Sequence, residues 1–458
     1  MKRKKEQLYE ALPFGLLLGM LVFFGIWQIA AKERTYSASE RRLLAKKPVL
    51  TKESLLDASY VSAYEEYLTD QFPMRDQWIT MKTYCGLILG RRESGGVYIA
   101  RDHSLIELHM PEIAEGETAE RNEECLTGFL RDMCAAGTKS VRVMLVPTAD
   151  GIWQDKLSPY AEPFDQQAYL EQLYAVLSKQ GLSECYVDVW EELAAHADEP
   201  IYYKTDHHWT MQGAHAGYAA YAASLSGEGS GDGMTQSGES SNAGMSQSGE
   251  SGDARVSQSG ESGDAGMSQS DQGGADSVVS AERSIAVPPW SAYETETARA
   301  DFHGTTAAKC GLYHIEDALL LVYPPGSGAE QYRVVYDGGE TESDSLYERS
   351  HAQGDDPYSV YLDGNHAMTE IFVTREGASA DASGAGAEGR SLLLIKDSYA
   401  NCFVPYLTGI YDEITMIDLR YYNGSLRALQ EEHGYTDVLV LYNLPNFLTE
   451  TTVYRLGK

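Results

Sequence analysis

A carboxylate and an imidazole near the middle of this 458-residue chain are spaced to form an oriented general base. The stretch YYKTDHHWT, residues 202–210, places Asp206 two positions before His208. A carboxylate bound to one ring nitrogen fixes the tautomer of a histidine, so that the other nitrogen can accept a proton. We interpret His208 as the base and Asp206 as the group that orients it. Asp206 could instead cap a helix that begins near Thr210, and we expect the adjacent His207 to face solvent or to pack.

A serine near the end of the chain is the best candidate for the nucleophile. The hydrophobic run SLLLI, residues 391–395, predicts a buried strand, and KDSYAN follows it. A serine just past a buried strand lies at the rim of an α/β sheet, where its side chain can emerge. The sequence therefore predicts a triad of Ser398, His208 and Asp206. His303 is the rival base, but no aromatic residue follows it as Trp209 follows His208.

These two blocks, together with the segment DQFPMR at residues 70–75, resemble the DHHW protein family of Gram-positive bacteria. That family is similar in turn to the SGNH-hydrolase-like domains of the alginate O-acetylation proteins, where an Asp-x-His pair precedes the serine. The resemblance covers most of the chain from about residue 36 to residue 447, apart from one insertion. It implies a Ser-His-Asp O-acyltransferase or esterase outside the cytoplasm.

The resemblance also implies donors for an oxyanion. In the SGNH pattern a glycine after the second strand and an asparagine after the third help to bind it, and Gly424 and Asn443 fall at comparable places. Arg420 is a further candidate to face the substrate, although it could pair with a carboxylate of the fold, and Asn443 could simply cap its strand. The match departs from the pattern at Lys396, where the hydrolases usually have glycine.

The start of the chain is basic and then apolar. MKRKK opens it, and residues 12–31 form an uncharged run of twenty. Such a run spans roughly 30 Å as a helix, which is the thickness of a bilayer core, and the basic cluster orients that end toward the cytoplasm. We predict a cytoplasmic tail at 1–11, a single transmembrane anchor at 12–31 and an extracellular remainder. A cleaved signal peptide is the alternative, although the run lacks a clear small-x-small site.

Strands alternate with helices from about residue 111 onward, which predicts a parallel sheet covered on both faces. The expected strands include 141–147, 185–190, 391–395, 413–419 and 437–441, with an antiparallel excursion between 319 and 374. Asp150 follows the first of them, and we interpret it as a turn residue. Together with the resemblance, the expected fold is α/β, an SGNH-hydrolase-like three-layer sandwich with a mostly parallel sheet at 111–458. Residues 32–110 are expected to form a membrane-proximal lead-in.

An insertion of different composition interrupts the domain at residues 225–284. Four eleven-residue units rich in Ser, Gly and Gln begin at Gly233, Gly244, Arg255 and Gly266. They carry too few apolar side chains to offset the entropy of ordering the chain, so we expect this insertion to be disordered.

The net charge of the chain limits its possible binding partners, and the spacing of its cysteines indicates their chemical state. The formal charge of -32 argues against nucleic acid, because a polyanion would be repelled over the whole surface. It suits a domain that faces neutral or cationic material. Six cysteines without CxxC or metal-like spacing are expected to be mostly free and buried.

The sequence thus predicts an extracytoplasmic, membrane-anchored O-acetyltransferase that acts on a cell-surface polysaccharide by a ping-pong route. The resemblance implies that a separate multi-spanning membrane acyltransferase supplies the acetyl groups. We expect no cofactor and no metal. The alternatives are a carbohydrate esterase of the same fold, a metal phosphoesterase with Asp206, His207 and His208 as ligands, and a non-catalytic scaffold that binds a cell-wall polymer.

Overall fold

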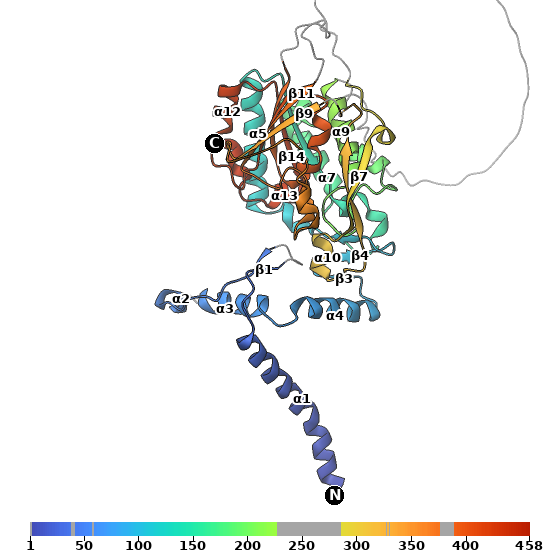
Figure 1. Ribbon diagram of the computed structural model, residues 1–458, viewed down its shortest axis with the longest axis vertical. Helices are drawn as coiled ribbons and strands as arrows, with labels where there is room; N and C mark the ends of the chain where they lie inside the picture. The colour runs from blue at the N-terminus through green and yellow to red at the C-terminus, as the bar shows by residue number, and fades with distance from the viewer. Residues whose placement is uncertain are drawn as a thin grey trace, which may run out of the picture.

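The computed structural model describes residues 2–37, 42–56, 59–226, 285–326, 328, 330–375 and 389–458. A long helix, a layer of short helices and an α/β domain follow one another along the longest axis (Figure 1). Of the predicted insertion, only Leu225, the last residue of a helix, and Ser226 fall within the described residues.

The first helix, α1, spans Lys2–Ala30. Its apolar part, Ala11–Ala30, has a mean hydropathy of 2.0, and none of its residues is buried in the protein. Its length and composition suit a membrane-crossing helix. A signal sequence at the N-terminus would have the same properties.

Three short helices lie across the end of α1, and we call them the platform (Figure 1). They are α2 (Lys52–Leu56), α3 (Ser59–Asp70) and α4 (Arg75–Ile88). Pro73 follows the end of α3, and Met74 takes a left-handed conformation with φ of 59°, which turns the chain into α4. The ring of Phe24 in α1 packs against Phe72 and Trp78, with centroid distances of 5.5 and 5.6 Å.

The platform is fixed to the α/β domain through α4 and α10 (Thr305–Cys310). The hydroxyls of Thr80 and Thr83 donate to the backbone carbonyls of Gly311 (2.9 Å) and Cys310 (2.6 Å). Gly311 has φ of +71°, and a Cβ there would lie 2.9 Å from the backbone nitrogen of Thr80. The close approach of the two helices therefore depends on a glycine at this position. A small sheet of β3 (Glu93–Ser94), β4 (Val97–Ile99) and β5 (Leu105–Glu107) lies beside them.

The α/β domain is built on a mixed seven-stranded sheet of order β10-β9-β11-β13-β12-β14-β6. Four strands at one side are parallel, and three at the other are antiparallel. The parallel strands are β13 (Glu413–Ile417), β12 (Ser391–Lys396), β14 (Asp437–Asn443) and β6 (Ser140–Val146). The antiparallel strands are β11 (Met368–Arg375), β9 (Glu330–Tyr336) and β10 (Thr341–Ser343).

Helices cover both faces of the sheet and make a three-layer sandwich (Figure 1). Alternate residues of β12 enter opposite cores, as the two-residue period of a strand requires. Leu392 and Leu394 join the core beneath α9, whereas Leu393 and Ile395 join the core on the other face. The helices are α9 (Met211–Leu225) and α11 (Val404–Leu407) on the first face and α5 (Glu117–Ala135), α7 (Gln166–Lys179), α12 (Leu426–His433) and α13 (Leu444–Thr449) on the second.

Two predicted strands have a different structure. Residues 185–190 make a single bridge, Val143 with Tyr186, and then enter α8 (Trp190–Ala195). The cause is Asp188, whose carboxylate accepts from the Trp190 backbone and starts the helix. Within the expected antiparallel excursion, the strand predicted at 359–362 is replaced by the end of the 3₁₀ turn Pro357–Val360 and a single bridge at Tyr361. The strand predicted at 319–323 forms as β8 (Asp317–Tyr323), but it pairs with β7 (Glu294–Phe302) in a separate sheet.

Candidate active site

The loop that carries Asp206 and His208 is closed by a β-bridge between Tyr202 and Trp209. Helix α9 begins directly after it, and Thr210 caps that helix by accepting from the Gly213 backbone N–H (3.2 Å). The residue that caps this helix is therefore Thr210, and the alternative interpretation of Asp206 as the cap is wrong.

Asp206 and His208 form a buried pair, with 3% and 5% of their surfaces exposed. The Nδ1 of His208 lies 2.5 Å from Oδ1 of Asp206, and the backbone N–H of His208 donates to the same oxygen (3.1 Å). The other carboxylate oxygen accepts from the backbone N–H of Thr305 (2.8 Å). A Cβ at Gly304 would lie 2.1 Å from the Cβ of Asp206, so the neighbouring segment approaches closely only because residue 304 is glycine.

Ser398 reaches this pair from the end of β12. The chain leaves the strand in the 3₁₀ turn Ser398–Cys402, which Asp397 caps by accepting from the Tyr399 N–H (2.9 Å). The Oγ of Ser398 lies 2.8 Å from Nε2 of His208. Segments 190 positions apart in the chain thus bring the three predicted residues into one hydrogen-bonded series.

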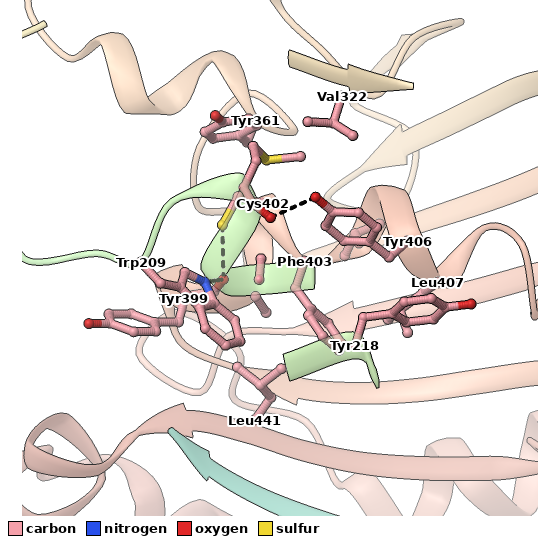
Figure 2. Close-up of a cluster of buried hydrophobic side chains, with 14 of the residues drawn as sticks. Trp209, Tyr218, Val322, Tyr361, Tyr399, Cys402, Phe403, Tyr406, Leu407 and Leu441 are labelled. Atoms are coloured by element: carbon pink, nitrogen blue, oxygen red, sulfur yellow. Dashed lines mark hydrogen bonds between the residues drawn. The ribbon is translucent and has the colours of Figure 1, made fainter. Parts of the chain in front are cut away.

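Aromatic rings hold the imidazole of His208 in place. The ring of Tyr358 stacks on it with a centroid distance of 3.8 Å and an interplanar angle of 10°. Trp209 lies beneath the site, where its indole N–H donates to the Tyr399 carbonyl (3.0 Å) and its ring stacks on Phe403 (Figure 2). Cys402, fully buried in the same cluster, is a core residue.

The two other histidines considered from the sequence have different surroundings. His207 contacts the hydroxyl of Thr305 through Nδ1 (2.6 Å), and burial together with the neighbouring His208 lowers its pKa to about 3. His207 is therefore neutral at physiological pH. His303 donates from Nε2 to the Tyr313 carbonyl (2.7 Å), and its ring packs edge-on against Tyr313, whereas His208 is the histidine whose Nε2 lies 2.8 Å from Ser398.

Ser398 opens into a cavity of about 660 Å³. Its wall combines residues of the α/β domain with Arg75 and Ile79 of the platform. The charged groups in the wall are mostly basic, although the chain as a whole is acidic, so the overall charge does not describe the cavity. The ionisable residues that line it are Arg75, Glu107, His109, His207, Lys309 and Arg420.

The three oxyanion or substrate candidates differ in position. Asn443 lines the cavity, caps α13 through its side-chain oxygen and donates from Nδ2 to Asp397 (2.8 Å). Arg420 also lines the cavity and holds Asp418 through Nε (2.9 Å) and Nη2 (2.5 Å). Gly424 is exposed, packs against the side chain of Tyr422 and does not line the cavity.

Lys396, where the resemblance departs from the usual pattern, is a buried anchor. Its ammonium donates to the side-chain oxygens of Asn365 (2.6 Å) and Asn401 (2.9 Å) and lies 3.5 Å from Asp418. Burial lowers the pKa of Lys396 to about 8. Because Lys396 is the last residue of an extended strand, its backbone needs no glycine, and its side chain ties the serine turn to neighbouring loops.

A second Asp–His pair, which sequence reasoning missed, lies at the same cavity. Asp150 is fully buried and accepts from His109 at both the backbone N–H (2.8 Å) and Nδ1 (3.0 Å). Its other oxygen accepts from Thr148 (2.7 Å) and Gln166 (2.8 Å). Burial favours neutral His109, but Asp150 and Glu107 outweigh it and raise its pKa. The only sequence signal was Asp150, directly after a strand at the edge where ligands bind.

Asp206, His207 and His208 also form a group whose ligand atoms lie within 4.8 Å of one another, which is close enough to hold a metal ion. Their nitrogen and oxygen atoms are already engaged with one another, with Thr305 and with Ser398. A metal ion at this place would have to replace the short Asp206–His208 bond. The hydrogen-bonded arrangement fits proton transfer from Ser398 better.

Comparisons with known proteins identify the fold. Residues 108–257 match the family described as the SGNH hydrolase-like domain of the acetyltransferase AlgX. A DHHW family protein from Eubacterium siraeum is similar at 19% identity and a TM-score of 0.52, over 79% of this chain and 95% of that chain. PatB1 from Bacillus cereus, solved with a sulfonyl adduct, is 17% identical with a TM-score of 0.49, over 79% of this chain and 100% of that chain. The O-acetyltransferase domain of Pseudomonas putida AlgJ is 12% identical with a TM-score of 0.39, over 79% of this chain and 98% of that chain.

The search of curated proteins finds no match. The predicted resemblance and fold class are confirmed by the family match and by the similarity to the DHHW family protein. This chain carries an SGNH hydrolase-like α/β domain similar to that of the acetyltransferase AlgX.

Proposed function

We propose that this protein is a membrane-anchored, extracytoplasmic O-acetyltransferase that modifies a cell-surface polysaccharide through Ser398, His208 and Asp206. The observation that carries the proposal is the 2.8 Å contact between Ser398 Oγ and His208 Nε2, with Asp206 bound to the opposite ring nitrogen. The match to an acetyltransferase family supports the same reaction class.

The geometry supports a two-step reaction. Ser398 Oγ attacks the carbonyl carbon of a donor acetyl ester while His208 accepts the serine proton. The tetrahedral intermediate collapses, the donor alcohol leaves with the proton from His208, and the acetyl group remains on Ser398. An acceptor hydroxyl then attacks this ester as His208 removes its proton, and Ser398 is released with the proton restored. Asp206 stabilises the imidazolium that forms in each step.

Two donors are placed to stabilise the oxyanion. The N–H of Ser398 is the first of its turn and has no acceptor within that turn. The Nδ2 of Asn443 gives one hydrogen to Asp397 and has a second to donate at the cavity wall. Such a donor contributes about 3 kcal/mol to transition-state stabilisation. Arg420, fixed by Asp418, contacts the acceptor from the same wall.

The N-terminal helix supports the proposed location. A basic start followed by an apolar helix orients a single span with its N-terminus in the cytoplasm. The α/β domain then lies outside the cell, where acetyl-CoA is absent. We infer that a multi-spanning membrane acyltransferase brings the acetyl group to Ser398.

The test is the intact mass of the full chain in detergent after incubation with an activated acetyl ester or a sulfonyl fluoride. We expect one adduct on Ser398, with none in Ser398→Ala and little in His208→Ala. His303→Ala, a change of the rival histidine, serves as the matched control and is expected to label normally. Folded protein without an adduct would contradict the triad and favour a polymer-binding scaffold.

A second measurement separates transfer from hydrolysis. The acetylated full chain is mixed with oligosaccharides of the cell surface, and both free acetate and acetylated sugar are quantified. Acetyl esters on the sugar are the expected product. Release of acetate alone, at the same rate with and without sugar, would identify an esterase instead.

A further inference from the structure

The platform differs from the α/β domain in what it exposes. Among the described residues, eleven large hydrophobic side chains between Val49 and Leu89 are exposed. In the described part of the chain beyond residue 92, Met110 and four tyrosines are the only large hydrophobic side chains that are exposed. Soluble proteins rarely leave such a concentration of apolar surface uncovered unless something binds there. The exposed set is Val49, Leu50, Leu55, Leu56, Val61, Leu68, Met74, Met81, Tyr84, Ile88 and Leu89.

The apolar side chains of α4 are arranged on one face. Met74, Met81 and Ile88 recur every seven residues, so they lie above one another along the helix. Thr80 and Thr83, which bind α10, lie on a different side. Trp78 is about 60° around the helix from Met81 by the 3.6-residue period, and it packs on Phe24 of α1. The apolar face of α4 therefore looks toward the side from which α1 arrives.

The contact with α1 also fixes the depth of the platform. Phe24 lies six residues before the end of the apolar helix at Ala30, which is about 9 Å along its axis. Phe72 and Trp78, which contact Phe24, must then lie at or just below the outer boundary of a bilayer that α1 crosses. Amphipathic helices bind a membrane at this depth, about 5–10 Å into the boundary between headgroups and acyl chains.

Charge in this part of the chain suits a bilayer. Between Lys32 and Arg92 there are eleven basic and eight acidic residues, whereas the whole chain carries a net charge of -32. A segment with a net positive charge is attracted to anionic lipid, while the strongly acidic remainder is repelled from it.

An apolar groove of about 600 Å³ runs between α1, α3 and α4. Leu68, Phe72 and Trp78 contribute to its wall. Arg75 and Ile79 line both this groove and the cavity of Ser398. One helix thus separates the catalytic cavity from the surface that faces the span.

We propose that the platform lies in the outer surface of the lipid bilayer, with the apolar face of α4 in the boundary between headgroups and acyl chains. This inference rests on the membrane anchor of the proposed function. It places one wall of the catalytic cavity at the membrane surface. An acetyl donor held in the membrane then reaches Ser398 without leaving the membrane.

The test uses a nitroxide label on the full chain, in vesicles of phosphatidylcholine and phosphatidylglycerol. The label is attached at Ile88→Cys, with Tyr160→Cys as a matched control. These side chains are 84% and 93% exposed, one on the platform and one on the α/β domain. The background carries Cys85→Ser and Cys134→Ser, which remove the exposed native thiols. Accessibility to oxygen, which concentrates in lipid, is compared with accessibility to a water-soluble nickel complex.

We expect the label at residue 88 to favour oxygen several-fold more strongly than the label at residue 160. Equal nickel accessibility at both positions would overturn the inference. A label at 88 that is shielded from both reagents, with dipolar broadening that disappears on dilution with unlabelled chain, would overturn it in favour of a second copy as occupant.

Flotation of the vesicles separates this inference from the proposed function. A chain that fails to float with the vesicles lacks the anchor, which contradicts the proposed location as well. A chain that floats but has an aqueous label at residue 88 contradicts only the placement of the platform. Neither measurement depends on turnover, so Ser398→Ala protein should give the same accessibility.

Discussion

Two Asp–His pairs lie at the same cavity, and they differ in what meets the far side of the imidazole. In the pair of Asp206 and His208, Nε2 of the histidine contacts Ser398. In the pair of Asp150 and His109, no described group hydrogen-bonds to Nε2 of the histidine. The carboxylates are alike in burial and in the four hydrogen bonds that each accepts, but they differ in partners. Asp206 is bound by His208 and Thr305, whereas Asp150 is bound by His109, Thr148 and Gln166.

The difference shows that an Asp–His pair alone does not define a catalytic base. His208 is held in a plane by Tyr358 and has a hydroxyl within reach, so a proton can move to it. Asp150 holds the ring and the backbone of His109 just as Asp206 holds those of His208, but no described group hydrogen-bonds to the other ring nitrogen of His109. We therefore expect the first pair to control the reaction and the second to control stability and the charge of the cavity wall.

The largest effect should follow from Asp206→Asn. Both oxygens of Asp206 face N–H donors, and an asparagine has only one acceptor oxygen and no negative charge to stabilise the imidazolium. Turning its N–H₂ toward Nδ1 favours the tautomer with a proton on Nε2, which is unable to remove the serine proton. The rate of Ser398 labelling by an activated ester should fall about 10⁴-fold. Asp150→Asn is the control and should label at close to the original rate. Equal losses in the two variants would remove the distinction between the pairs.

Asp150→Asn should instead lower stability. Its carboxylate accepts hydrogen bonds from Thr148, Gln166 and His109. The side-chain N–H₂ of an asparagine would face at least one of these N–H or O–H groups and leave it without an acceptor. Leaving a buried group unsatisfied costs about 2 kcal/mol or more. The midpoint of urea unfolding should fall accordingly, as followed by tryptophan fluorescence. An unchanged midpoint would show that Asp150 is replaceable in this network.

The pH dependence of stability should sharpen the same comparison. The pKa of His109 is raised above 6.5 in the folded chain, so protonation favours the folded state. This stabilisation is complete below pH 6.5 and is lost as the pH rises through the folded pKa. His109→Gln should therefore cost more unfolding free energy at pH 6 than at pH 9.

In the Asp150→Asn background, His109→Gln should cost the same unfolding free energy at pH 6 and at pH 9. The reason is that the main partner of the imidazolium is then gone. Urea midpoints of the four chains at both pH values form the measurement. A pH-dependent difference that persists in the double variant would assign the raised pKa to Glu107 instead.

The smallest effect is expected for Thr305→Val. This change removes a hydroxyl that contacts Asp206 Oδ2 (3.3 Å) and His207 Nδ1 (2.6 Å), while the stronger backbone bond to Asp206 stays. A loss of about 1 kcal/mol, or about fivefold in the labelling rate, is expected. The adjacent Thr306 offers a matched control, because its buried hydroxyl has no hydrogen-bond partner among the residues that the structure describes. Thr306→Val should label normally, and an equal loss in both variants would point to packing.

The sequence was most informative where function depends on short segments. A carboxylate two residues before a histidine and a serine after a hydrophobic strand each gave a local signal. The fold then brings Ser398, at the end of β12, within 2.8 Å of His208 in the loop before α9. Strands β6, β12 and β14 were also predictable from short segments, because a continuous run of hydrophobic residues is typical of a parallel strand that is buried on both faces.

The rest of the site depends on contacts between distant segments. His109, Lys309 and Arg75 reach the cavity from a loop, from α10 and from the platform, and no periodicity places them there. Gly424 was chosen by its order after a strand, but its loop turns toward Tyr422. The role of Lys396 also required the structure, because its partners Asn365 and Asp418 come from other loops.

The two ends of the low-complexity insertion meet in the folded domain. The backbone N–H of Ile285 donates to the hydroxyl of Ser226 (2.9 Å). Loop-closure entropy changes by only about 0.6 kcal/mol for each doubling in length, so the number of repeats can grow or shrink during evolution at little energetic expense. The same junction is a suitable position for an engineered epitope tag or reporter domain, because the segments of His208 and Ser398 lie on opposite sides of it in the sequence.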